Sequence, residues 1–360
     1  MSSSLQHYKL TVSYNGSRFQ GFQRQMAQPK AGSSRPTKQP RRIDDDNDAK
    51  MASDSSTTLK KPQKGVPLTV QDCLEQAMLH YIHHNSPSPS FSLTDLRLRV
   101  SGRTDKGVHA VGQVVTVLMP TTIQPLLGTL RAALNSRLPD DIVIRRIERV
   151  KMDSFHPRTN AIQKTYSYTL TFRRVNEPRR TTQLPKGAGI HSFRKPFAVG
   201  IPLWNVPWPL NTAHWQEIAT VLQGTHDFTP FVHKDERHET HERTVLEIAF
   251  DIAHDNVCLD FPGTSVVTAT WKFTASGFAR GMVRHLMGFI VHVSKWQPIQ
   301  GEETNGNTTK EPPLPLSSLW QDLASSSSSS SYFASLIHTA PASGLCLEQV
   351  LYDDKTVVEP

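Results

Sequence analysis

Three charged residues lie between two glycines in the stretch GRTDKG: Arg103, Asp105 and Lys106 follow Gly102 and precede Gly107. Glycine permits backbone turns that other residues resist, so this stretch is expected to form a tight loop. Neighbouring cations favour the charged form of a carboxylate, even in a site closed to water. An ionised, partly desolvated carboxylate can act as a nucleophile or stabilise a developing cation. Asp105 is therefore a candidate catalytic residue, although a charged hairpin loop without chemistry has the same composition.

The charge of the whole chain favours a polyanionic partner. Its 360 residues are enough for about two domains with their own cores. The formal net charge is +8 and the pI is near 9.4, which is typical of proteins that bind nucleic acids. About half of the excess charge lies in residues 28–66, a stretch rich in Pro, Ser, Lys and Arg that we expect to be a disordered insertion. The three cysteines are too far apart in the sequence to predict a disulfide framework or a metal site.

The start of the chain and its hydropathy argue against a membrane protein. The first ten residues lack the basic and apolar regions of a signal peptide, and a strand-like pattern begins at Tyr8. No apolar run approaches the roughly 20 residues that cross a bilayer. We therefore expect a cytoplasmic or nuclear protein without membrane association.

Hydrophobic periodicity predicts the elements that position the loop. Alternating or continuous apolar residues predict strands, and apolar residues three or four apart predict helices. The expected strands are residues 8–14, 96–100, 108–119 and 142–150, with one helix starting at the capping box of Thr69 and Asp72 and another over 126–134. This order of strands and helices is that of the ferredoxin-like split βαβ fold.

The second half of the chain is expected to repeat this unit. The pattern predicts strands at 165–172, 245–252, 257–261, 265–274 and 345–352, and helices at 212–222 and 278–293. We therefore predict an α+β fold with two ferredoxin-like halves, residues 1–150 and 151–360, whose antiparallel sheets meet at a central catalytic cleft. Residues 176–209 and 300–331 lack periodicity and are expected to be insertions in the second half.

Several motifs resemble one family of enzymes. GRTDKGVHA (102–110) is similar, residue for residue, to the catalytic signature of the TruA-type tRNA pseudouridine synthases. Other motifs of this family resemble YNGSRFQGFQRQ (14–25), TVQDCLEQAM (69–78), ALNSRLPDDI (133–142), FHPRTNAIQKTYSY (155–168), GTHDFTPF (224–231) and APASGLCLEQVLY (340–352). The resemblance spans nearly the whole chain outside the three insertions.

The resemblance implies an intramolecular isomerase that converts uridine to pseudouridine in tRNA, in the anticodon stem-loop at about positions 38–40. The bond from N1 to C1′ breaks, the uracil turns within the site, and C5 joins C1′, so no water is consumed and no cofactor is needed. A stacked base is out of reach, so the target must first be flipped into a pocket. The expected partners are tRNA and, because the family is typically homodimeric, a second copy of the chain.

The resemblance also assigns roles to individual residues. Asp105 is implied to be the catalytic nucleophile, which either attacks the sugar or assists deprotonation there. Tyr166 matches the tyrosine that packs on the target base, and Arg284 the basic residue that pairs with the aspartate. Taken alone, Tyr166 is equally typical of a core aromatic and Arg284 of a solvated helix residue. The candidate substrate-binding residues are Arg103, Lys106, Tyr168, Gln23, Arg24 and His109.

Two other functions are compatible with the residue types. One is a catalytically silent tRNA-binding protein on the same fold, which the intact Asp105 and Tyr166 disfavour. The other is a metal-dependent nuclease with Asp105 as a ligand, which the lack of a second carboxylate in the motif disfavours. RHETHER (237–243) lacks the order of a zinc-binding HExxH motif, so no metal site is expected. The cluster of Arg145, Arg146 and Arg149 is a candidate for phosphate binding.

The sequence departs from the motifs of the family at a few positions. Phe22 stands where the family usually has Trp, which replaces one aromatic ring with another. Gln163 and Lys164 stand where an arginine is common before Tyr166. None of these differences removes a residue implied to be catalytic.

Overall fold

The computed structural model describes residues 5–24, 68–86, 91–150, 155–175, 203–233, 241–257, 264–295 and 335–353. The expected insertions at 28–66 and 300–331 lie outside these ranges, as do residues 176–202 of the remaining insertion. Cys73 and Cys346 are free thiols, and Cys258 is outside the described residues. Within the described ranges, no helix combines the length and apolar character needed to span a bilayer.

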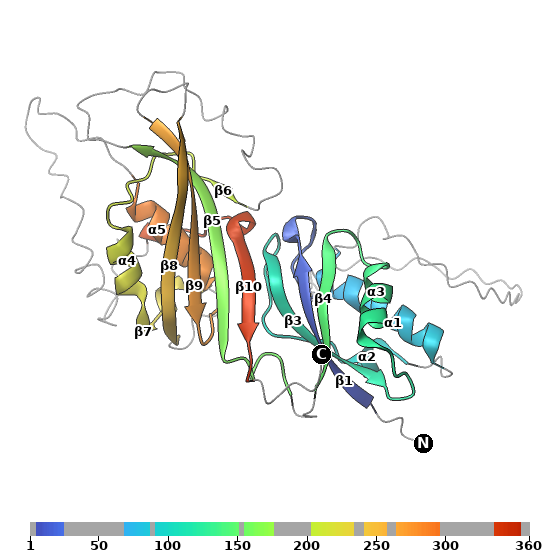
Figure 1. The fold of residues 1–360 in the computed structure, drawn as a ribbon. Coiled ribbons are helices and arrows are strands. Elements are labelled where there is room, and N and C mark those ends of the chain that lie inside the picture. The colour runs from blue at the N-terminus through green and yellow to red at the C-terminus, as the bar shows by residue number, and fades with distance from the viewer. Residues whose placement is uncertain are drawn as a thin grey trace, which may run out of the picture.

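The described strands form one mixed sheet of ten strands (Figure 1). Their order is β4-β1-β3-β10-β5-β9-β8-β7, with β2 beside β3 and β6 beside β5. The strands are β1 (Leu5–Tyr14), β2 (Arg99–Val100), β3 (His109–Pro120), β4 (Ile142–Arg149), β5 (Gln163–Val175), β6 (Trp204–Asn205), β7 (Gly224–Asp227), β8 (Glu242–Val257), β9 (Thr264–Ala275) and β10 (Leu345–Leu351). The α-helices are α1 (Val70–Asn85), α2 (Leu93–Leu96), α3 (Leu127–Asn135), α4 (Trp215–Leu222) and α5 (Met282–Val293). The expected α+β class is confirmed.

Strand β10 joins the two parts of the sheet. In Figure 1 it lies, in red, between β5 and β3. It runs parallel to β3, with Cys346 opposite His109, and antiparallel to β5, with Leu347 opposite Tyr166. The C-terminal strand was expected only to complete the sheet of the second half. Instead it makes one continuous sheet, and its pairing with β3 is parallel.

Alternation of side chains on β1 builds the core of the first part. Tyr8, Leu10 and Val12 are buried on one face of the strand. They belong to the same buried cluster as Leu74 of α1 and Leu130 of α3. The expected capping box at the start of α1 is confirmed, because the Thr69 and Asp72 side chains each accept a hydrogen bond from the other residue's backbone.

Aromatic packing builds the core of the second part. The ring of Trp215 in α4 contacts Phe172 of β5, Phe250 of β8 and Trp271 of β9, with centroids 5.0 to 5.5 Å apart. Its indole Nε1 donates a hydrogen bond to Ser294 at the end of α5, 2.9 Å away. This tryptophan therefore ties both helices to the sheet, and a buried indole N–H that lacked such a partner would be costly.

Some expected elements have different bounds in the structure. Residues 96–100 were expected to form a strand, but Ser92 and Asp95 form a capping box that starts α2, and only β2 is extended. Helix α5 was expected from residue 278 and begins at Met282, because Gly281 before it has a left-handed backbone with φ of +75°. The strand expected at 245–252 extends from Glu242 to Val257, with an irregular pairing to β9 near its end, and residues 258–261 of the next expected strand lie outside the described residues.

The edge strand β4 is covered by side chains of α3. Asn135 donates from Nδ2 to the Ile144 carbonyl (3.0 Å) and accepts at Oδ1 from the Ile144 N–H (2.8 Å). Arg131 donates to the next carbonyl, that of Arg145 (2.9 Å). Peptide groups that would be unpaired at the edge of the sheet are thus satisfied by one helix.

Replacing Asn135 with Ala should lower the free energy of unfolding by about 1 to 3 kcal/mol, because two backbone groups of β4 lose their partners. Denaturant unfolding of the variant and the wild type measures this difference. Ser136→Ala is the matched control, since the exposed Ser136 hydroxyl donates to the Ala133 carbonyl and, among the described residues, makes no bond to β4. Equal stability of the two variants would contradict the proposed role of Asn135.

Candidate active site

The loop that carries Asp105 has its backbone fixed from two sides. Gly107 has φ of +82°, a conformation that favours glycine, and the Val108 N–H donates to the Asp105 carbonyl (3.1 Å). From the segment after β1, the Phe22 N–H donates to the Thr104 carbonyl (3.1 Å). Gly21, with φ of +102°, lies so close that a Cβ there would come within 2.9 Å of the same carbonyl oxygen. The motif at residues 14–25 therefore supports the Asp105 loop through its backbone.

A buried hydrogen-bond network joins the loop to β1 and β3. The Tyr14 hydroxyl at the end of β1 is 2.7 Å from the Thr104 hydroxyl. Gln113 of β3 donates from Nε2 to the Gly102 carbonyl (2.9 Å) and accepts at Oε1 from the Ser101 hydroxyl (2.7 Å). A fully satisfied buried network of this kind stiffens the segment that it holds.

Two arginines from a distant part of the chain lie beside the Asp105 carboxylate. Arg284 Nη1 is 3.5 Å from Asp105 Oδ2, and Arg280 Nε is 4.0 Å from Oδ1. The loop itself predicted Arg103 and Lys106 as the cations next to Asp105, and the family resemblance predicted Arg284. The side chains of Arg103 and Lys106 are both exposed, and neither is in an ion pair within the described ranges. The loop thus points its own cations to solvent, and the first turn of α5 and the residues before it supply the nearby positive charge.

The side chain of Arg284 is held in place by the segment before β10. Its Nε donates to the Ala340 carbonyl (2.7 Å), and the Ala340 N–H donates to the Arg284 carbonyl (3.1 Å). Only 20% of the side chain is exposed, against 36% for Asp105. The close fit continues at Gly288, where a Cβ would come within 1.7 Å of the His338 carbonyl oxygen. Arg284 is therefore a fixed charge beside Asp105.

Tyr166 lies on β5 under the same loop. It is 9% exposed, and its ring meets the edge of Phe278 with centroids 5.2 Å apart. A Cβ on Gly102 would be 4.0 Å from the Tyr166 hydroxyl, so the tyrosine contacts the start of the loop. Burial raises the pKa of Tyr166, with smaller effects from Tyr14 and from the negative charge of Asp105. The hydroxyl is therefore protonated at neutral pH.

Lys164, two residues before Tyr166, supports the loop from β5. Its Nζ donates to the Ser101 carbonyl, 2.7 Å away. Burial, and secondly the positive charge of Arg158, lowers the pKa of Lys164 to about 8. The resemblance places an arginine here in the family; the lysine ammonium has three N–H donors, and a guanidinium would have five in a planar arrangement.

The other candidate substrate-binding residues have different surroundings. Tyr168 is fully buried, and its hydroxyl donates to the Pro341 carbonyl (2.8 Å), so it belongs to the core and leaves no face for a substrate. His109 is 4% exposed and accepts from the Gly16 N–H (3.2 Å), and burial lowers its pKa. Arg24 forms ion pairs with two carboxylates of α1, and Gln23 beside it is half-buried.

Residues that the sequence reasoning did not assign to the site are Arg280, Phe278, Lys164 and Thr104. Arg280 is four residues before Arg284, a spacing that would put both on one face of a helix. That spacing was the one available signal for Arg280. The helix was expected to begin at Phe278, whereas this residue precedes the helix and contacts Tyr166.

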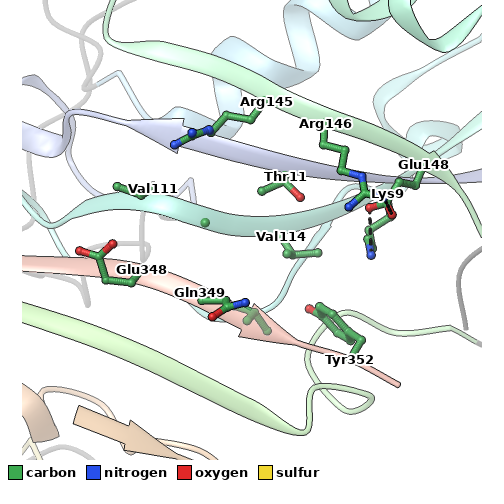
Figure 2. Close-up of a pocket in the computed structure, with 12 residues that line it drawn as sticks. Lys9, Thr11, Val111, Val114, Arg145, Arg146, Glu148, Glu348, Gln349 and Tyr352 are labelled. Carbon is green, nitrogen blue, oxygen red and sulfur yellow. Dashed lines mark ion pairs between the residues drawn. The ribbon is translucent and has the colours of Figure 1, made fainter. Parts of the chain in front are cut away.

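A hollow of about 480 Å³ lies on the face of the sheet opposite to Tyr166 (Figure 2). Glu348 lines it and accepts from the Ser167 hydroxyl (2.5 Å). Since Ser167 follows Tyr166 in β5, the two side chains point to opposite faces, so this hollow is separate from Tyr166. The dashed lines in Figure 2 join Lys9 and Arg146 to Glu148, at 3.0 and 3.2 Å. Of the three arginines in the cluster, only Arg146 pairs with a carboxylate among the described residues, and it shares that carboxylate with Lys9, so the cluster keeps most of its positive charge.

Comparison with known proteins identifies the family. A model of the tRNA pseudouridine synthase family matches residues 218–353. The chain is 31% identical to tRNA pseudouridine synthase A of Geobacillus kaustophilus over 269 residues, which is 74% of this chain and 81% of that protein. It is 29% identical to the enzyme of the same name from Thermodesulfovibrio yellowstonii over 263 residues, 72% and 84% of the two chains. Protochlamydia amoebophila has a tRNA pseudouridine synthase A 2 that is 26% identical over 355 residues, 98% and 96% of the two chains.

The matches define a class of enzyme, the pseudouridine synthases, which are intramolecular isomerases. Within this class, the chain belongs to the TruA-type tRNA pseudouridine synthase family. The similarity to the protein from Protochlamydia amoebophila extends over nearly the whole chain, and this range includes the loop of Asp105 and the helix of Arg284.

Lys164 predicts a pH dependence of stability. Between about pH 8 and the ordinary lysine pKa, the unfolded chain keeps a proton that the folded protein has released from Lys164. Stability rises with pH where the unfolded state binds more protons, so this residue's contribution should increase from pH 7 to pH 9.5. The unfolding free energy of the wild type minus that of Lys164→Gln should grow by on the order of 1 kcal/mol over this range. Other groups titrate in both proteins and cancel; a difference that stays constant or shrinks would show that the pKa of Lys164 is not lowered.

Proposed function

We propose that this enzyme isomerises uridine to pseudouridine in the anticodon stem-loop of tRNA, with Asp105, Tyr166 and Arg284 as its catalytic residues. The main support is the meeting of Asp105 with Arg284, 179 positions away in the chain, at a distance of 3.5 Å. Tyr166 approaches the same loop from a third segment. Three residues that the family resemblance names independently are therefore neighbours in space.

The proposed reaction conserves the atoms of the substrate. The bond between N1 and C1′ breaks, and C5 of the rotated uracil bonds to C1′. C5 then loses its proton, and N1 gains one, so no oxidant, water or cofactor enters the balance. Asp105 supports bond cleavage either by attack on the sugar or by assisting deprotonation there, and both routes use a carboxylate oxygen beside the ribose.

The surroundings of Asp105 suit this chemistry. A charge that is partly removed from water interacts more strongly with its neighbours than one in bulk solvent. Arg284, held by Ala340, needs little reorganisation during the reaction, which is the condition for effective electrostatic stabilisation. The ring of Tyr166 is the candidate surface for packing against the flipped base, and stacking of this kind contributes about 1 to 3 kcal/mol.

The family resemblance also supports proposals for the domain arrangement, the oligomeric state and the cellular compartment. We propose that residues 1–150 and 151–360 act as two lobes with the catalytic cleft between them, and that two copies of the chain form a homodimer. The site of action is proposed to be the cytoplasm or the nucleus. Arg103 and Lys106, whose side chains are exposed on the Asp105 loop, are candidates for contact with the RNA backbone.

Asp105→Asn should lower the rate of pseudouridine formation by a factor of about 10³ or more while tRNA still binds, because the shape of the side chain is kept and its charge is lost. Carbodiimide probing of tRNA incubated with each protein maps the product, and filter binding measures affinity. Asp140→Asn, which changes an exposed residue before β4, is the matched control. Unchanged modification by the Asp105→Asn variant would refute the proposed nucleophile, and strand cleavage sensitive to EDTA would indicate the nuclease instead.

Tyr166→Phe should retain activity within about threefold, because the ring that packs on the base remains. Tyr166→Leu should lower kcat/KM by the equivalent of about 1 to 3 kcal/mol. Both variants must be checked for folding by circular dichroism, since the residue is buried. A loss of activity in the Phe variant as large as in the Leu variant would assign the essential role to the hydroxyl group.

A further inference from the structure

Arg280 combines a fixed backbone with an exposed side chain. Its carbonyl accepts from the His233 N–H (3.1 Å), and the residue after it, Gly281, has the left-handed conformation that starts α5. A Cβ at Gly281 would be 3.2 Å from the ring of His285, so this turn fits its surroundings closely. The side chain of Arg280 is nevertheless 49% exposed. The backbone of Arg280 is therefore held in place, while its guanidinium is exposed to solvent.

The contacts of Arg280 differ from those of Arg284. Arg284 is 20% exposed and has a hydrogen bond to the Ala340 carbonyl besides its contact with Asp105. Among the described residues, the guanidinium of Arg280 has only the ion pair with Asp105 Oδ1, at 4.0 Å. This distance is too long for a hydrogen bond. Ion pairs with so much exposure contribute little, so the guanidinium can leave Asp105 at small cost.

The two oxygens of Asp105 are thus in different situations. Oδ2 faces the fixed Arg284, and Oδ1 faces the exposed Arg280. An oxygen that acts on the ribose must be reachable from solvent, which favours Oδ1. The ribose of a flipped nucleotide has a phosphate on each side, so an arginine beside Oδ1 lies within reach of one of them. Guanidinium groups match phosphate oxygens with two parallel hydrogen bonds.

We propose that Arg280 binds the phosphate next to the target uridine, and that in doing so it leaves Asp105 Oδ1 free to act on the ribose. In the free enzyme the guanidinium lies beside Oδ1, and in the complex it moves to the RNA backbone. Arg103 and Lys106 are also exposed, but neither is paired with Asp105, so their movement would not change its surroundings. This inference rests on the proposed function, since it assumes that Asp105 acts on a nucleotide.

The test compares Arg280→Gln with the wild type on tRNA stem-loops that carry one neutral methylphosphonate, either 5′ or 3′ of the target uridine. Arg280→Lys retains the charge without the two-pronged geometry. Arg137→Gln is the control for loss of charge, because Arg137 is exposed after the end of α3 and bonds to His80 of α1. Binding is measured at several salt concentrations, and kcat and KM are measured on the unmodified stem-loop.

We expect Arg280→Gln to raise KM about tenfold and to reduce the slope of log K against log salt by about 0.7 to 0.9, the value for one phosphate contact. The value of kcat should fall less than about threefold, because the variant leaves Oδ1 unblocked. One of the two methylphosphonates should weaken binding by the wild type about tenfold and binding by Arg280→Gln less than about twofold. Arg280→Lys should give intermediate effects, and Arg137→Gln should respond to the methylphosphonates as the wild type does.

An equal methylphosphonate penalty in the wild type and in Arg280→Gln would overturn the inference. So would a loss of kcat at saturating RNA with an unchanged salt slope, because that result would make Arg280 a structural partner of Asp105. These binding measurements do not need turnover. Absence of pseudouridine in the reaction of the wild-type protein would count separately, against the proposed function itself.

Discussion

The pairing of β10 with both β3 and β5 is the interaction on which the geometry of the site depends. Asp105 precedes β3, and Tyr166 lies within β5, so the position of one relative to the other is set by the strand between them. The segment that leads into β10 also holds Arg284, through the reciprocal hydrogen bonds of Ala340. One short piece of chain near the C-terminus therefore aligns three parts of the protein, and hydrogen bonds of a sheet are well suited to this because their register leaves little freedom.

Some groups around Asp105 are held by hydrogen bonds, and others are exposed to solvent. The hydrogen bonds of Tyr14, Thr104 and Gln113 join the loop to β1 and β3, and Lys164 joins the first residues of the loop to β5. Arg284 is fixed by the chain that packs on α5, whereas Arg280 is exposed at 49% of its side chain. A site that must accept a large, flexible nucleic acid benefits from this division, since the reacting group stays in position while the groups that meet the substrate adjust.

Local elements were predictable from the sequence, and long-range pairings were not. The capping box at Thr69 and the apolar run of β3 are local signals, and both elements formed where they were expected. The motif resemblance indicated Asp105, Tyr166 and Arg284, which are close together in the structure. Nothing in the pattern of β10 distinguishes a parallel from an antiparallel neighbour, so its junction role could not be foreseen. Likewise, closeness in the sequence suggested Arg103 and Lys106 as partners of Asp105. The approach of Arg280 could not be foreseen, because it depends on how α5 and the residues before it pack against the loop. Tyr168 shows the same limit, since strand alternation gives its face but not what covers that face.

The amide of Asn135 has a consequence for assembly. By offering both a donor and an acceptor to Ile144, it imitates the backbone of an adjacent strand. Together with Arg131, it occupies the hydrogen-bonding positions that another polypeptide would need at that border. Extension of the sheet past Ile144 and Arg145 is thus blocked, so a strand of another chain cannot pair with this part of β4. The same side chain that stabilises β4 therefore also disfavours edge-to-edge association at this strand.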